Sequence, residues 1–93
     1  MRVDLKLFVP QLPEAIGRRE LEVAFAGETV GDLIEHLVAR YGRTARKALY
    51  EDGELDPVIQ ILLNGEKWVT RDQLDTTLRD GDSVMLMMLM GGG

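Results

Sequence analysis

The chain has 93 residues, 45% of them hydrophobic and 29% charged, which is enough apolar material for one small folded domain. Its formal net charge of −5 argues against a nucleic-acid partner, because such partners require a basic surface. The lack of cysteine excludes disulfides, iron–sulfur clusters and thiol catalysis. No apolar run is long enough to span a membrane and no signal-peptide pattern is present, so we expect a cytoplasmic protein with no membrane partner.

Two strands are predicted near the N-terminus. Apolar and polar residues alternate over residues 3–9 and again over residues 20–25, which is the period of a half-buried strand. Pro10 and Pro13 lie in the connection between them, and we expect residues 10–17 to form a loop. The two strands therefore favour an antiparallel hairpin with a long connection.

A helix is the most secure element of the sequence. Apolar residues recur at helical spacing over residues 30–41. Thr29 is a suitable N-cap, and Asp32 stands three residues later, where an acidic capping residue belongs. Gly42 is placed to end the helix, and a shorter helical piece is predicted over residues 43–50.

The second half of the chain predicts three further strands. Residues 58–63 are rich in strand formers, and the Asn64-Gly65 pair that follows is a strong hairpin signal leading into a short strand over residues 66–69. Residues 51–54 and 80–82 have turn compositions, and residues 70–78 favour a helical turn or an extended connection. A last strand is predicted over residues 83–89.

These elements favour an α+β fold in which a mixed sheet of about five strands packs on one main helix. If the last strand lies beside the first, the two are parallel and have antiparallel strands on either side. This is the β-grasp, or ubiquitin-like, arrangement. We predict one β-grasp domain over residues 1–90 and a flexible C-terminal glycine tail over residues 91–93.

Several motifs, in this order and spacing, resemble the ubiquitin-like sulfur carriers, among them the molybdopterin synthase small subunit and the thiamine-biosynthesis sulfur carrier. The resemblance covers essentially the whole chain. It is carried by residues 74–84 (LDTTLRDGDSV), by the terminal Gly92-Gly93, by Leu62-Leu63-Asn64-Gly65, and by Gly27-Glu28-Thr29-Val30 where the helix begins. The tail departs from the pattern, because residues 88–91 (MLMG) stand where synthase small subunits often carry prolines and a small residue.

The resemblance implies that the reactive group is the terminal carboxylate of Gly93. A ubiquitin-activating-like enzyme would adenylate Gly93 with ATP, and a sulfur donor would convert the adenylate to a thiocarboxylate. An acceptor enzyme, such as a molybdopterin synthase large subunit, would then take the sulfur. The chain itself would bind no cofactor or metal and would be a carrier rather than an enzyme. Gly91 and Gly92 would form a tail thin enough to enter a narrow channel, because glycine lacks Cβ.

A docking surface is predicted on the sheet face that points away from the helix. Alternation places Met85, Met87 and Leu89 of the last strand on this face, together with Phe8 and Leu62 from other strands. An exposed apolar patch of this kind usually marks an interface. The alternative is that residues 43–57 or a second copy of the chain covers it.

Other features favour ordinary structural roles. His36 is interpreted as a solvated surface histidine, and Asp80-Gly81-Asp82 as a turn rather than a calcium loop. Trp68 is expected to shield the edge of the sheet. The acidic residues 51–54 favour a solvated loop, with a basic partner as the alternative. Residues 43–47 carry a local basic cluster that is more typical of a solvated helix face than of a phosphate site: Arg43, Arg46 and Lys47.

Four functions therefore stay open. The leading one is a sulfur carrier for molybdopterin synthesis, favoured over thiamine synthesis by the chain length and by residues 74–82. A protein modifier that forms isopeptide bonds through Gly93 would begin with the same adenylate. A β-grasp module that binds partners without covalent chemistry is the fourth.

Overall fold

The structure, a computed structural model, describes residues 1–88, except for the side chain of Ala15. The predictions for Leu89, Gly91, Gly92 and Gly93 therefore lie outside the described residues. The elements are β1 (Arg2–Phe8), α1 (Leu12–Ile16), β2 (Glu20–Ala24), α2 (Val30–Leu49), β3 (Tyr50–Glu51), β4 (Glu54–Leu55), β5 (Ile59–Leu63), β6 (Lys67–Val69), the 3₁₀-helix η1 (Arg71–Gln73) and β7 (Ser83–Met88).

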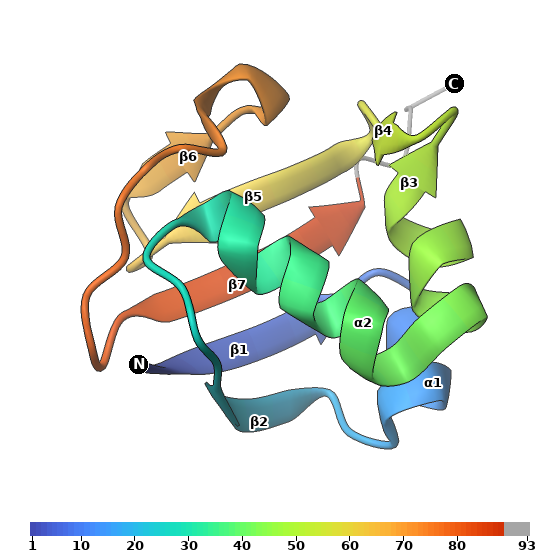
Figure 1. Ribbon diagram of the computed structural model, residues 1–93, viewed down its shortest axis with the longest axis horizontal. Coiled ribbons are helices and arrows are strands. Elements are labelled where there is room, and N and C mark those ends of the chain that lie inside the picture. The colour runs from blue at the N-terminus through green and yellow to red at the C-terminus, as the bar shows by residue number, and fades with distance from the viewer. Residues whose placement is uncertain (89–93) are drawn as a thin grey trace.

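The main sheet is mixed, as the sequence predicts. Its five strands lie in the order β2-β1-β7-β5-β6, and α2 packs across one face (Figure 1). β1 and β7 form a parallel pair at the centre, with Leu5 opposite Val84 and Leu7 opposite Leu86. The neighbouring pairs β1–β2, β5–β7 and β5–β6 are antiparallel. This confirms the β-grasp topology.

The hydrophobic core lies between the sheet and α2. The alternate residues Leu5 and Leu7 of β1, and Val84 and Leu86 of β7, are at most 1% exposed. Leu33, Ile34 and Leu37 of α2 are equally buried, because their helical spacing places them on one side. The two central strands are therefore fixed by the helix on one face only.

The start of α2 is a capping box, as predicted. The Thr29 hydroxyl accepts a hydrogen bond from the Asp32 backbone N–H at 3.1 Å. Asp32 Oδ2 in turn accepts from the N–H groups of Glu28 at 2.9 Å and Thr29 at 3.1 Å. These bonds, first the one from Glu28 and then those with Thr29, lower the pKa of the Asp32 carboxyl because they favour its ionised form.

Gly42 ends the first helical piece of α2, as predicted, and a second piece follows it. Its φ of 73° and ψ of −145° are not helical, so the two helical pieces that the sequence predicts are joined across a kink. Only glycine adopts this region easily. The kink turns the second half of the helix toward the small β3–β4 hairpin, which replaces the simple turn expected over residues 51–54.

One connection differs from the prediction, and another agrees with it. Residues 10–17 are not only a loop, because they contain α1, which has a proline in its first turn and Leu12 fully buried. Burial of Leu12 in the core gives this short helix tertiary support that the sequence pattern does not reveal. Residues 70–78 contain η1 and then an extended stretch, in which Thr77 bridges to Thr29.

Candidate functional site

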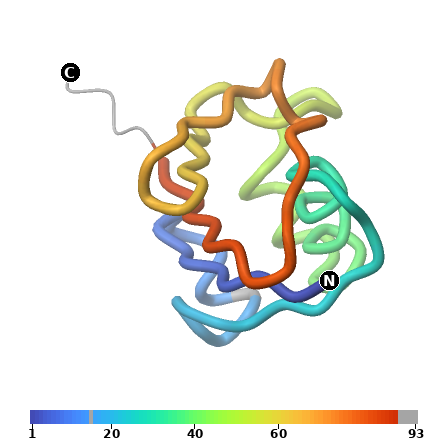
Figure 2. The backbone as a smooth tube through the Cα atoms, turned by 90° about the vertical axis from the view of Figure 1, so that its left-hand side faces the viewer, coloured from blue at the N-terminus to red at the C-terminus, as the bar shows by residue number. Residues whose placement is uncertain are grey.

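The candidate site is the sheet face that points away from α2, here called the outer face. Viewed along the layers, α2 lies on one side of the sheet, and no other described layer covers the opposite side (Figure 2). β7 alternates between the two environments: Val84 and Leu86 are fully buried, whereas Met85 and Met87 are partly exposed. The period of two that predicts this alternation is confirmed.

Cross-strand register brings the predicted docking residues together. Met87 lies opposite Phe8 of β1, and Met85 lies opposite Leu62 of β5. Residues opposite each other on neighbouring strands are close enough for their side chains to form one continuous surface. Phe8 is 45% exposed. Four of the five predicted residues therefore form one surface, and the fifth, Leu89, lies outside the described residues.

Trp68 extends this surface, which the sequence reasoning missed. It lies on the edge strand β6, opposite Leu62 on the outer face, and is 53% exposed. The cause is the register of the β5–β6 hairpin. A two-residue Asn64-Gly65 turn would pair Leu63 with Glu66, but Leu63 pairs with Lys67. The hairpin has one more residue than that turn requires, and this shift of one residue sends Trp68 to the outer face.

We define the outer patch as Phe8, Leu62, Trp68, Met85 and Met87. Its neighbours on the side of β1 and β2 are charged. Lys6 lies opposite Met85 on one side and opposite Glu20 on the other, and Asp4 lies opposite Glu22. Glu22 also pairs with Arg2 at 3.0 Å. The patch is thus apolar at its centre and acidic along the β2 edge, and a partner with a basic rim would complement it.

Phe8 and Met87 form the part of the outer patch nearest the end of the sheet where the described chain stops, while Met85, Leu62 and Trp68 lie toward the start of β7. Because β1 and β7 are parallel, their carboxyl ends meet at the same edge, and the last residues paired across them are Phe8 and Met87. A hollow of about 450 Å³ beside Phe8 is lined by Pro10, Pro13 and Arg19, among others. The five residues that follow Met88 can span at most about 17 Å. A protein seated on the outer patch would therefore be within reach of the C-terminal carboxylate.

The other predicted features have structural explanations. Asp80 Oδ1 accepts from the Arg2 N–H at 2.7 Å, and Asp82 Oδ2 accepts from the Arg79 N–H at 2.8 Å, which confirms a turn. Within residues 1–88 no group of three or more His, Asp or Glu side chains could hold a metal ion. His36 is half-buried rather than fully solvated, with its ring centroid 5.9 Å from that of Phe25. No helix in the described part of the chain is long and apolar enough to cross a membrane.

Comparison with known proteins gives a consistent result. The sequence model of the ThiS family matches residues 7–93. A putative sulfur carrier protein of Archaeoglobus fulgidus is 36% identical over 89% of this chain and 94% of its own length. Small archaeal modifier protein 3 of Haloferax volcanii is 34% identical over the full length of both chains. The crystal structure of SAMP1 from Haloferax volcanii matches with a TM-score of 0.79 and 30% identity, over all of both chains.

Proposed function

Because the chain belongs to the ThiS family, we propose that it is a sulfur carrier whose reactive group is the C-terminal carboxylate of Gly93. In the first step this carboxylate attacks the α-phosphate of ATP in a partner activating enzyme, forming an acyl-adenylate and releasing pyrophosphate. A hydrosulfide equivalent then attacks the acyl carbon and expels AMP. The product is a terminal thiocarboxylate, which hands its sulfur to an acceptor enzyme.

The observation that carries this proposal is that the outer patch reaches the end of β7 through Phe8 and Met87. Met87 and Phe8 form the last pair between β1 and β7, one residue before the end of β7, so one partner can hold the folded domain while the tail enters its active site. Ordering a glycine costs about 1–2 kcal/mol. The tail alone should therefore bind weakly, and the outer patch would supply most of the affinity. We propose that it docks first the activating enzyme and then the acceptor.

In this role the chain is a co-substrate, with the ATP site and the catalytic residues belonging to its partner. We place the reaction in the cytoplasm, where ATP is available. Molybdopterin synthesis is the pathway we favour, from the chain length and residues 74–82, and the acceptor would then resemble a molybdopterin synthase large subunit. Thiamine synthesis is the alternative, in which the same Gly93 thiocarboxylate would be used.

A second candidate function is protein modification. It is favoured by the likeness to small archaeal modifier protein 3. The route would begin with the same adenylate, after which a lysine amine of a target would attack the acyl carbon and form an isopeptide bond. A module that only binds partners is the third possibility. The three differ in the product formed at Gly93, so one measurement separates them.

The test is incubation of the full chain with ATP, its activating enzyme and sulfide, followed by intact-mass analysis. Exchange of one oxygen for sulfur at Gly93 supports the carrier, and heavier conjugates in the presence of target proteins support the modifier. An unchanged mass, with the enzyme shown to be active on ATP, would contradict both. Deletion of Gly93 removes the residue whose carboxylate is adenylated. It should abolish the thiocarboxylate and the conjugates, and it should leave the thermal unfolding curve unchanged. A Met1→Ala variant, altered at the opposite end of the chain, serves as the matched control.

A further inference from the structure

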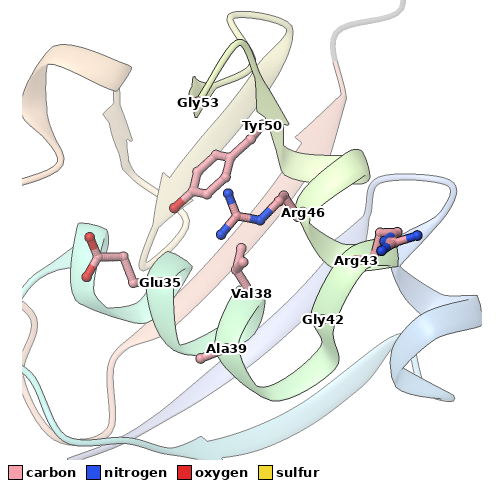
Figure 3. Close-up of a pocket in the computed structure, with 8 residues that line it drawn as sticks. All are labelled: Glu35, Val38, Ala39, Gly42, Arg43, Arg46, Tyr50 and Gly53. Carbon is pink, nitrogen blue, oxygen red and sulfur yellow. The ribbon is translucent and has the colours of Figure 1, made fainter.

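A second surface of the molecule lies on the helix side, away from the outer patch. The kink at Gly42 bends α2 so that its two halves and the β3–β4 hairpin enclose an open hollow of about 680 Å³ (Figure 3). Val38 and Ala39 contribute an apolar floor, and Arg43 and Arg46 contribute positive charge. The hollow is built from residues that the outer patch does not use.

Arg46 and Tyr50 supply the polar chemistry of this hollow. The Arg46 guanidinium lies 5.8 Å from the centroid of the Tyr50 ring, and the two side chains lie side by side in Figure 3. Stacking on an aromatic ring orients a guanidinium and leaves its N–H groups available along the edge. Burial raises the pKa of the Tyr50 hydroxyl, and Glu35 adds to this while Arg46 opposes it, so the hydroxyl is a donor at neutral pH. Both groups can donate to one carboxylate.

Positive charge is concentrated in the stretch of α2 that contributes Arg43 and Arg46 to the hollow, although the protein as a whole is acidic. Four of the eleven basic residues fall within eight positions of α2, and all four are exposed: Arg40, Arg43, Arg46 and Lys47. The ion pairs found within residues 1–88 are Arg2–Glu22 and Arg71–Glu54, neither of which uses them. The cluster is therefore available to a partner, which goes beyond the solvated helix face that the sequence favours.

We propose that this hollow docks an acidic segment of a partner protein, with one carboxylate held by Arg46 and Tyr50. An apolar side chain of the same segment would lie on Val38 and Ala39, a contact that a simple anion could not use. A nucleic acid fits less well, because its row of phosphates offers no aliphatic side chain to lie on Val38 and Ala39. Since α2 and the outer patch lie on opposite faces of the sheet, both partners can bind at once.

The test is a titration of the ¹⁵N-labelled full chain with a short acetylated peptide of Glu and Asp residues interspersed with leucine. We expect the amide signals of Ala39, Gly42 and Gly53 to shift, while those of Met85 and Met87 stay in place. Arg46→Gln should weaken binding about tenfold, as expected for loss of a charge-assisted contact. Tyr50→Phe removes only the hydroxyl and should weaken binding by less. Arg79→Gln removes one exposed positive charge elsewhere and should leave the affinity unchanged.

Several results would overturn the proposal. Equal weakening by Arg46→Gln and Arg79→Gln, or shifts spread over the whole surface, would indicate general charge attraction. Tighter binding of inorganic phosphate or of a single-stranded oligonucleotide at the same amides would assign the hollow to another ligand. The same shifts on concentrating the protein alone would assign it to a second copy. Arg43→Gln repeats the test at a second position, and a well-dispersed spectrum shows that each variant is folded.

Discussion

The two faces of β7 are both apolar, but only one of them is used by the fold. Val84 and Leu86 are fully buried against α2, whereas Met85 and Met87 point to the uncovered outer face and are only partly buried. The inner residues are branched and fill a fixed space. The outer ones are methionines, whose flexible and polarizable side chains adapt to differently shaped surfaces. The inner face is therefore suited to fixed packing, and the outer face to contact with surfaces of different shapes.

This contrast predicts that neighbouring residues of one strand respond differently to substitution. An inner residue contributes mainly to the free energy of unfolding, and an outer residue mainly to the free energy of binding. The free energies of unfolding and of binding are measured separately, so the role assigned to each face can be tested independently. The predictions below run from the largest expected effect to the smallest.

Leu86→Ala should give the largest effect, a loss of about 2–5 kcal/mol in the free energy of unfolding, because it leaves a cavity in a core that is fully closed. Met87→Ala, one residue later, should cost no more than about 1 kcal/mol, because solvent can fill the space that it leaves. Urea unfolding followed by circular dichroism measures both. Equal losses would mean that the outer face is also part of the structural core.

Met87→Asp tests the outer face directly. A charge within the outer patch should reduce the affinity for the activating enzyme at least tenfold, which corresponds to about 1.4 kcal/mol. Isothermal titration calorimetry with the purified enzyme measures this. The control is Ala24→Asp, which adds the same charge to the same face of the sheet. Ala24 lies opposite Arg2 at the start of β1, whereas Phe8 of the outer patch lies at the end of β1. Normal binding by folded Met87→Asp would remove the docking role from the patch.

Most of the fold could be predicted because its signals are local. The alternation in β1 and β7, the capping box at Thr29 and the Asn64-Gly65 turn each depend on neighbouring residues only. The helix α1 could not be predicted, since five residues do not form a stable helix alone and its support comes from burial of Leu12. Tertiary packing decides such short elements.

The candidate site was predictable to the extent that strand alternation determines it. Phe8, Met85 and Met87 follow from alternation and from the parallel pairing of the first and last strands. Trp68 does not, because its face depends on whether the hairpin contains two or three connecting residues, and Asn64-Gly65 is compatible with both. The hollow around Arg46 depends on the direction of the chain after Gly42, which the sequence does not specify.

Thr29→Ala acts on α2, the helix that covers the inner face, and should lower the free energy of unfolding by less than Leu86→Ala does. The variant loses the hydroxyl that accepts from the Asp32 N–H, and removal of an N-cap of this kind costs about 1 kcal/mol of folding stability. Thermal or urea unfolding measures the change, and Thr29→Ser is the control, because it keeps the hydroxyl. The affinity for the activating enzyme should be the same in all three proteins once they are folded. A selective loss of binding in Thr29→Ala would show that the two faces are coupled.

The smallest effect is a pH dependence at the same cap. Hydrogen bonds from Glu28 and Thr29 lower the pKa of Asp32 in the folded state, so the unfolded chain holds this proton more tightly. The stabilisation is therefore fully present above about pH 5, and it is lost as the pH falls through about 4 toward the folded pKa. In Asp32→Asn the free energy of unfolding should change less with pH over that interval. Above it, the curves of the variant and of the unsubstituted protein should run parallel. If acid instead perturbs the amide signals of Phe8 and Met87 before those of residues 28–32, the outer face is the acid-sensitive one, and the separation between the two faces does not hold.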